Sequence, residues 1–306
     1  MLVTACPGQG AQKAGFLTSW LELPGFSTTL GTLADASGID LRTHGTESDD
    51  ATITDTAIAQ PLLVAAAIAS FTEIFGDDLQ TDIVAGHSVG EIGAAAIAGI
   101  LSPAQAMTLV QARGAAMADA AGAAASGMAA VVGGDPDGVL TAITDAGLEP
   151  ANVNGGGQTV AAGASERIEE FAANPPDRAR VIPLKVAGAF HTSFMSPASD
   201  AVAATAKTLS PQDPSVTILT NSDGTAVPSG ADYLDLLVSQ VTNPVRWDRC
   251  QETLLASGVT GILELVPGGT LTGLAKRAMK GVEVFPVKSA DDIEAAREFV
   301  RAHAGA

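Results

Sequence analysis

The chain has 306 residues, of which 46% are hydrophobic, and its formal net charge at pH 7 is −18. This length favours one large domain with room for a smaller insertion, and the apolar content excludes a disordered chain. The negative charge argues against nucleic acid as a partner, because a phosphate backbone would be repelled.

The charge is unevenly distributed along the sequence. Residues 1–153 contain three Lys or Arg against 17 Asp or Glu, whereas residues 154–306 contain 13 against 17. Some of the basic residues of the second half cluster locally, such as Arg246 and Arg249 of "RWDR" and Lys276, Arg277 and Lys280 of "KRAMK". Such clusters are either ordinary solvent-exposed surface or a surface that binds an anionic partner.

The apolar runs, the N-terminal segment and the two cysteines indicate where the protein is located and whether it binds a metal. Gly, Pro or charged residues interrupt each apolar run, so we expect no membrane span. The opening "MLVTACPGQG" does not resemble a secretion signal, and we expect a cytoplasmic protein. Cys6 and Cys250 match no metal or redox spacing, so we expect both to be buried and no metal to be bound.

The first half of the chain predicts strands that alternate with helices. A strand over 2–6 ends at the glycine-rich loop "PGQGAQ", and a polar region with few regular signals follows to about Asp55. The next predicted elements are a long helix to Gly76, a buried strand over 82–86, a helix to about Gly99 and a helix opened by Ser102-Pro103. This alternation indicates a parallel sheet covered by helices on both faces.

The pattern changes between about Ser126 and Gly188. This segment predicts the order strand, helix, strand, strand, helix, strand, which fits a small ferredoxin-like insertion. The α/β alternation then resumes with a strand at 215–221, a helix at 231–242, a strand at 261–266 and a helix at 270–279. We therefore expect a main body of residues 1–125 and 189–306, with a small subdomain of residues 126–188 packed on it.

A serine lies between two glycines where the strand over 82–86 gives way to a helix, in "GHSVG". A sharp strand-to-helix elbow needs small residues beside its nucleophile, and Gly86 and Gly90 provide them. The free N–H groups at the start of the following helix face any negative charge that forms beside Ser88. Ser88 is thus a candidate nucleophile, although a phosphate-binding turn or simple tight packing would use a similar sequence.

A serine nucleophile needs a base, and the sequence has four histidines. His87 adjoins Ser88 and should point the other way, while His44 lies in a polar stretch and His303 near the C-terminal end. Elimination favours His191, which follows a strand in "VAGAFH", over a purely structural role for this histidine. No acidic third member is evident, so a backbone carbonyl or an amide is expected to orient the imidazole.

Two further features of the sequence concern anion binding. The loop "PGQGAQ" lacks the Lys and Ser/Thr of a nucleotide cradle. It is either a plain tight turn or a loop that aims the Gln9 amide at an oxyanion together with the Val89 amide. Arg113 lies in the apolar helix "MTLVQARGAAM" and needs a partner if buried, either a protein carboxylate or the carboxylate of a substrate.

The motifs taken together are familiar. In order along the chain they are "PGQGAQ", "GHSVGE", "LVQARG", "GAFH", "QVTNPVRW" and "PGGTLTGLAKR". With these motifs the chain resembles, nearly end to end, the malonyl-CoA:acyl carrier protein transacylases of fatty-acid synthesis and the related acyltransferase domains of polyketide synthases. The resemblance implies an α/β fold, with an α/β-hydrolase-like catalytic body, a parallel central sheet and an inserted ferredoxin-like subdomain.

The resemblance also implies a ping-pong acyl transfer without a bound cofactor. Ser88 would attack malonyl-CoA with His191 as base, and the Gln9 and Val89 amides would hold the oxyanion. The phosphopantetheine thiol of acyl carrier protein would then take the malonyl group. Arg113 matches the family arginine that grips the malonyl carboxylate, and Gln240 matches the position whose main-chain carbonyl orients the histidine.

Two positions bear on the choice of acyl unit. Val89 after the serine and Phe190 before the histidine match the malonyl-type patterns of the wider family, whereas methylmalonyl-type relatives typically have glutamine and serine there. A phenyl ring beside the α-carbon would crowd a methyl branch, an effect of about 1–3 kcal/mol. The other interpretation of Phe190 is plain core packing.

Other functions compete with malonyl transfer. One is a serine hydrolase or esterase on the same elbow, another a polyketide-pathway acyltransferase with a different carrier, and a third a silent subunit that docks carrier protein. Retention of Ser88 and His191 counts against the third, and a buried Arg113 has no use in a simple esterase. We expect a monomer whose docking of the acidic carrier uses the basic clusters, including Lys276, Arg277 and Lys280.

Overall fold

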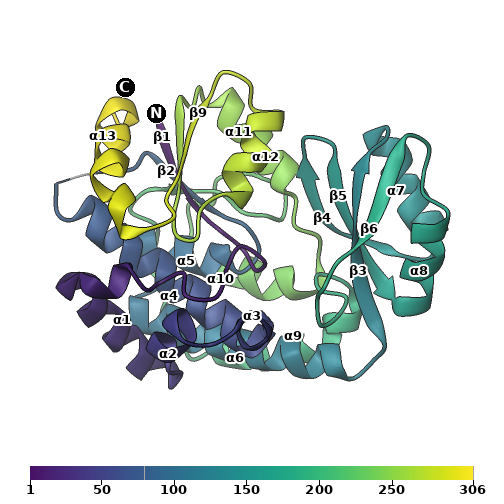
Figure 1. The fold of residues 1–306 in the computed structure, drawn as a ribbon, viewed down its shortest axis with the longest axis horizontal. Helices are drawn as coiled ribbons and strands as arrows, with labels where there is room; N and C mark the ends of the chain where they lie inside the picture. The colour runs from purple at the N-terminus through teal and green to yellow at the C-terminus, as the bar shows by residue number, and fades with distance from the viewer. Residues whose placement is uncertain (79, 306) are drawn as a thin grey trace.

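The computed structural model describes residues 1–78 and 80–305 and has two unequal parts (Figure 1). The larger part contains both ends of the chain and a parallel sheet, and the smaller part contains an antiparallel sheet. The predicted α/β class and the insertion of a second sheet are therefore confirmed.

The parallel sheet of the larger part has β1 at its centre. In the described residues its order is β7-β2-β1-β8-β9, where β1 is Leu2–Cys6, β2 Ile83–Gly86, β7 Thr217–Ile218, β8 Gly261–Glu264 and β9 Glu283–Pro286. Val3 lies opposite Ile83 on one side and Ile262 on the other. Because all neighbours are parallel, the loops after β1 and β2 emerge at the same edge of the sheet.

Side chains alternate between the two faces of this sheet. Leu2, Cys6 and Val84 pack into the core that contains helices α1, α4, α5, α6 and α13. Val3 and Ile83 pack instead into the core formed with α11 and α12. The helices of the larger part are α1 Pro24–Ser37, α2 Leu41–Thr46, α3 Asp50–Thr54, α4 Thr56–Phe75, α5 Gly90–Ile97, α6 Pro103–Gly122, α9 Ser196–Ala206, α10 Gly230–Ser239, α11 Trp247–Ala256, α12 Thr270–Ala278 and α13 Ile293–His303.

Helix α4 corrects the expectation that no apolar run reaches the length of a membrane span. Its 20 residues pass that test by length and composition, with a mean hydropathy of 1.7. In the fold, however, 78% of the tested window is buried inside the protein. The helix is apolar because it packs against α1, α5 and α6 in the centre of the larger core.

The polar region before Asp55 is helical, which corrects the expectation of little regular structure there. Helices α2 and α3 each begin at an aspartate, Asp40 and Asp49, whose side chain accepts a hydrogen bond from a backbone N–H of the first turn. Helix α1 ends at Gly38, which has a φ of +68°. These residues are typical helix caps, so the polar residues that suggested a loop are the ends of short helices.

Elements near the C-terminal end were also incompletely predicted. Strand β9 and helices α9, α11 and α13 lie outside the predicted elements, and the strand expected over 215–221 is only the two residues of β7. A single isolated bridge between Leu219 and Ala226 extends it. Strands β7 and β9 lie at the two edges of the parallel sheet. Short edge strands are hard to predict from sequence, because only a few of their residues follow a strand pattern.

The smaller part has the predicted ferredoxin-like order. Its elements are β3 Ser126–Gly133, α7 Pro136–Asp145, β4 Glu149–Gly155, β5 Gln158–Ala164, α8 Ser165–Ala173 and β6 Ala179–Pro183. The strand order is β4-β5-β3-β6, with every pair antiparallel. The helices pack on one face over Val131, Ile143 and Phe171.

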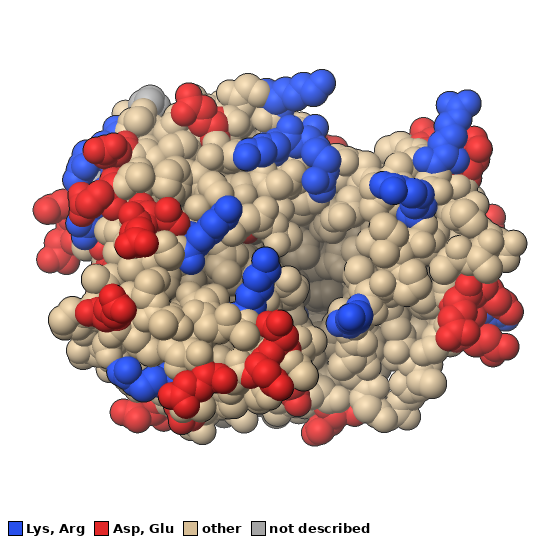
Figure 2. All heavy atoms as spheres, viewed as in Figure 1, with Lys and Arg blue, Asp and Glu red and all other residues tan. Residues whose placement is uncertain are grey.

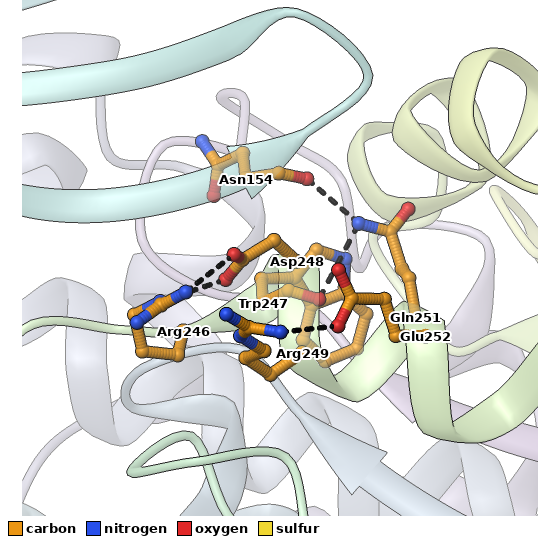
Figure 3. Close-up of polar contacts among 7 residues, drawn as sticks. All are labelled: Asn154, Arg246, Trp247, Asp248, Arg249, Gln251 and Glu252. Atoms are coloured by element: carbon orange, nitrogen blue, oxygen red, sulfur yellow. Dashed lines mark hydrogen bonds and ion pairs between the residues drawn. The ribbon is translucent and has the colours of Figure 1, made fainter. Parts of the chain in front are cut away.

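Strand β4 joins the smaller part to the larger one. The N–H of Val153 donates to the carbonyl of Val245, and the N–H of Val245 donates to the carbonyl of Ala151, both at 2.9 Å. The Gln251 side chain on α11 donates to the carbonyl of Asn154 at 2.7 Å (Figure 3). Backbone pairing of this kind fixes β4 against the body, as expected for an insertion that lacks flexible linkers.

Candidate active site

Ser88 occupies the elbow between β2 and α5. Its φ is +54°, a left-handed conformation that is unfavourable for a residue with a side chain. A Cβ at Gly86 would lie 2.1 Å from the carbonyl carbon of Gly90, and one at Gly90 would lie 2.2 Å from the carbonyl oxygen of Cys6. Both glycines are therefore required by close packing, and the Ser88 N–H is held by Asn221 Oδ1 at 2.8 Å.

His191 approaches Ser88 from the segment that follows the smaller part. Its Nε2 lies 2.7 Å from Ser88 Oγ, and its Nδ1 lies 2.9 Å from the carbonyl oxygen of Gln240. A carbonyl only accepts, so Nδ1 carries the proton and Nε2 presents its lone pair to the hydroxyl. His191 also has a positive φ, +61°, so both members of the pair have left-handed backbones.

The surroundings keep His191 neutral. Burial of the ring, together with the positive charge of Arg113, lowers the pKa of His191 to about 3. The hydrogen bond from Nδ1 to Gln240 acts in the opposite direction but is the weaker effect. The imidazole is therefore unprotonated at neutral pH, as a general base must be.

The other three histidines bond elsewhere. His87 Nε2 lies 2.8 Å from Asn154 Oδ1, His44 Nδ1 lies 3.0 Å from Ser48 Oγ, and His303 Nδ1 lies 3.0 Å from Thr260 Oγ1. His87 lines the same cavity as Ser88, but its ring is held by the smaller part rather than by the serine. In the described residues, His191 is the histidine that bonds Ser88.

The loop after β1 lies against the elbow. The N–H of His87 donates to the carbonyl of Cys6 at 3.0 Å, and a Cβ at Gly8 would lie 2.7 Å from the carbonyl oxygen of His87. Within residues 1–78 and 80–305, the N–H groups of Gln9 and Val89 donate to no other backbone group or side chain. They are thus free to bind an anion next to Ser88, which is the arrangement expected of an oxyanion hole.

Arg113 is buried in α6, with 1% of its surface exposed. The expected protein carboxylate is not its direct partner. Nη1 donates to Gln60 Oε1 and Nη2 to Gln240 Oε1, both at 2.7 Å, and Nη2 lies 3.5 Å from Ser88 Oγ. Burial lowers the pKa of Arg113 to about 10, so the guanidinium remains charged at neutral pH.

Several residues of this site were missed from the sequence. Gln60 is a buried amide in an otherwise apolar stretch of α4, and Glu91 is a buried carboxyl in the first turn of α5. A polar residue on a helix face that should be buried is a signal, because such a group needs a partner. Asn221, which follows β7, gave no such signal.

A cavity of about 360 Å³ opens at Ser88 and His191. Gln9 and His87 line it from the larger part, while Asn152 and Val160 line it from the smaller part. Phe190 also lines this cavity and is 7% exposed, so its ring is both packed and in contact with the space beside the serine. A pocket of this size accommodates a small ligand or the end of a longer one.

The two basic clusters differ in their surroundings. Arg246 pairs with Asp248 at 2.7 Å and Arg249 with Glu252 at 2.8 Å (Figure 3), so the "RWDR" arginines are largely neutralised. Lys276 and Arg277 are exposed in α12, and in the described part of the chain they form no ion pair. Figure 2 shows Lys and Arg side chains along the rim of the hollow between the two parts.

Comparison with known proteins agrees with this geometry. The acyl transferase domain family matches residues 3–298, and the chain therefore belongs to the acyl transferase family. Malonyl CoA-acyl carrier protein transacylase of Mycobacterium tuberculosis (strain H37Rv) is 47% identical over 300 residues, covering 96% of this chain and 98% of the relative. The enzyme of that name from Escherichia coli K12 is 31% identical over 301 residues, covering 95% and 97%.

Solved structures give the same result. The crystal structure of MCAT from Mycobacterium tuberculosis has a TM-score of 0.91 at 46% identity, covering 97% of this chain and 99% of that one. A type II polyketide acyl carrier protein in complex with its malonyl-transacylase, PlMCAT:AntF, contains a chain with a TM-score of 0.91 at 29% identity, with the same coverage. The resemblance to malonyl-CoA:acyl carrier protein transacylases is confirmed, and the chain is an acyltransferase.

Proposed function

We propose that this chain transfers the malonyl group of malonyl-CoA to the phosphopantetheine thiol of acyl carrier protein, through a malonyl ester of Ser88. The observation that carries the proposal is the position of Arg113. A buried guanidinium lies 3.5 Å from the hydroxyl of a serine that is itself 2.7 Å from a neutral histidine. A nucleophile and a fixed cation together select an acyl group that ends in a carboxylate.

In the first half-reaction His191 Nε2 takes the proton of Ser88, and Oγ attacks the thioester carbonyl. The tetrahedral oxyanion is bound by the free amides of Gln9 and Val89. The C–S bond then breaks, and coenzyme A leaves as the thiol with the proton from His191. The second half-reaction reverses these steps: the carrier thiol gives its proton to His191, its sulfur attacks the ester, and Ser88 Oγ recovers the proton.

Arg113 would determine which acyl group the enzyme accepts. Its guanidinium has five N–H donors, of which two are taken by Gln60 and Gln240. The remaining donors can bind the malonyl carboxylate, and Phe190 lies where a branch at the α-carbon would be crowded. A simple esterase needs no buried cation, so Arg113 favours transfer of malonyl over the hydrolase alternative.

Acyl carrier protein is the proposed acceptor, and its acidic surface would complement the exposed Lys276 and Arg277 of α12 and Lys280 just beyond it. The solved relative PlMCAT:AntF contains an acyl carrier protein of the polyketide type. We further propose that the protein is a cytoplasmic monomer without bound cofactor or metal, with residues 126–188 as its small subdomain and residues 1–125 and 189–306 as its body.

The test is intact-mass spectrometry after mixing the protein with malonyl-CoA in the absence of carrier protein. We expect a malonyl adduct that maps to Ser88 and is absent in Ser88→Ala. Acetyl-CoA at the same concentration should give a much smaller fraction of adduct. Free malonate without an adduct would support a hydrolase, and no reaction at all would support a silent docking subunit.

A further inference from the structure

A buried polar network links Arg113 to a carboxylate that it does not touch. Glu91 is 1% exposed and lies in the first turn of α5, three residues after Ser88. Its Oε2 accepts a hydrogen bond from the side-chain amide of Gln240, whose Oε1 accepts one from Arg113 at 2.7 Å. Gln240 thus stands between a buried anion and a buried cation.

The two ends of the Gln240 amide are chemically different, and only one of them can face Arg113. A guanidinium offers only N–H donors, so it needs the carbonyl oxygen of the amide. The NH₂ end of Gln240 must then be directed to acceptors. It has three, which are Glu91 Oε2, the carbonyl of Ser88 at 3.2 Å and Asn221 Oδ1 at 3.4 Å. Glu91 is the charged one, and charge-assisted hydrogen bonds are the strongest.

Glu91 is itself held by donors. Its Oε1 accepts from the N–H of Asn221 at 2.7 Å and from the Tyr233 hydroxyl at 3.3 Å. All the groups that contact the carboxyl thus donate to it, an arrangement suited to an ionised carboxylate. Burial raises the pKa of Glu91, whereas these hydrogen bonds and the charge of Arg113 lower it, and the donors at both carboxyl oxygens favour the ionised form.

We propose that Glu91 is a positioning residue for substrate selection, which fixes the amide of Gln240 so that its oxygen holds Arg113 in the orientation that receives the malonyl carboxylate. The inference rests on the proposed function and deepens it. The carboxyl of Glu91 forms no hydrogen bond with the side chain of Ser88 or His191 in the described residues, and it acts through Gln240. In Glu91→Gln the new NH₂ group faces a donor, either Gln240 Nε2 or the Asn221 N–H, and in both orientations the charge-assisted hydrogen bond to Gln240 is lost, so the amide of Gln240 is held less firmly.

The experiment compares two acyl donors that differ in the carboxylate. Acylation of Ser88 is followed by quenched-flow intact-mass spectrometry with malonyl-CoA, and by release of p-nitrophenol from the neutral ester p-nitrophenyl acetate. Glu91→Gln should raise the KM for malonyl-CoA at least tenfold and change the rate with the neutral ester less than threefold. Glu298→Gln, the same substitution at an exposed glutamate of α13, is the matched control and should retain the KM of the wild type.

A double-variant cycle separates positioning through Gln240 from a general structural role. Gln240→Met removes both ends of the amide and should also raise the KM for malonyl-CoA at least tenfold. Glu91→Gln in that background should then add less than a threefold further loss, because the group that Glu91 positions is gone. Gln240→Met also tests the proposal if Glu91→Gln fails to fold.

The results that would overturn the role of Glu91 differ from those that would overturn the proposed function. Equal losses with both acyl donors, additive losses in the double variant, or an unchanged KM in Gln240→Met would overturn the role of Glu91. A lower KM in Glu91→Gln would also overturn it, since the carboxylate would then act as a repelling charge. If the wild type forms no malonyl adduct while it reacts with the neutral ester, the proposed function fails first, and this inference with it.

Discussion

His191 is oriented by a neutral group, the main-chain carbonyl of Gln240, at 2.9 Å from Nδ1. In a serine triad with an aspartate, the carboxylate both orients the imidazole and stabilises its protonated form. Here the carbonyl fixes the tautomer but brings no negative charge, and the nearest strong charge is the cation of Arg113. The histidine of this site is therefore a correctly oriented base that resists protonation in the resting enzyme.

The pH dependence of acylation follows from this environment. The ordinary pKa of histidine is about 6.5, and burial and Arg113 lower that of His191 to about 3. Because the neutral form is the base, the rate of Ser88 acylation should not fall between pH 7 and pH 5 through protonation of His191. The check is the initial rate of adduct formation with malonyl-CoA across this range. An inflection near pH 6.5 that disappears in variants of His191 would contradict the prediction.

Arg113→Met tests the carboxylate clamp. The variant keeps an unbranched side chain that packs where the stem of the arginine lies, but it loses the guanidinium and every N–H donor, so the malonyl group should lose its charge-assisted hydrogen bonds. We expect the ratio of acylation rates, malonyl-CoA over p-nitrophenyl acetate, to fall about 100-fold, which corresponds to ~3 kcal/mol. A parallel loss with both donors would assign Arg113 to structure instead.

The left-handed backbone at Ser88 predicts a difference in stability between two inactive variants. Alanine keeps a Cβ at a φ of +54°, whereas glycine adopts this conformation without a steric penalty. Ser88→Gly should therefore be more stable than Ser88→Ala by about 1 kcal/mol, and its melting temperature higher by ~2–4 °C. Calorimetry of both variants measures this difference, and equal melting temperatures would show that the elbow relaxes when the serine is replaced.

Phe190 is predicted to exclude branched acyl units. Replacement by alanine opens space in the cavity beside Ser88, so methylmalonyl-CoA should gain on malonyl-CoA by about tenfold in acylation rate, within the 1–3 kcal/mol that one methyl group is worth. Competition between the two thioesters, read by the mass of the adduct, measures the ratio. An unchanged ratio would leave Phe190 with core packing alone.

The docking surface is tested by charge reversal. Lys276→Glu together with Arg277→Glu should raise the KM for acyl carrier protein about tenfold and leave malonyl adduct formation unchanged, because α12 would then repel an acidic partner. The matched control is Arg301→Glu, an exposed arginine on α13. A KM that is the same in all three proteins would eliminate the α12 surface as the docking site.

The sequence predicted those features of the fold that depend on residues close together along the chain. The elbow at Ser88, the capped start of α6 at Ser102 and the succession of strands and helices along the insertion all follow from residues within a few positions of one another. The helices between residues 24 and 54 were not predicted although their caps are also local, because two of them are only five or six residues long and show no apolar periodicity.

The partners of buried polar groups could not be predicted in the same way. Arg113 bonds Gln60, which is 53 residues away, and Gln240, which is 127 residues away. The sequence shows that a buried guanidinium needs acceptors, but many side chains could provide them, and the fold alone determines which ones lie within reach. The sequence left the partner of Arg113 open between a protein carboxylate and a substrate carboxylate; its direct protein partners are two amides, and the carboxylate of Glu91 lies one hydrogen bond beyond Gln240.

The cavity at Ser88 has room for about one small ligand, about 360 Å³, and both halves of the reaction must use it. Strand β4, which lines this cavity with Asn152 and Asn154, is hydrogen-bonded to the body. Coenzyme A and the phosphopantetheine group of the carrier protein must therefore bind in this cavity one after the other. We expect free coenzyme A to compete with carrier protein for the acylated enzyme. A high cellular concentration of free coenzyme A would therefore lower the rate of malonyl transfer to the carrier.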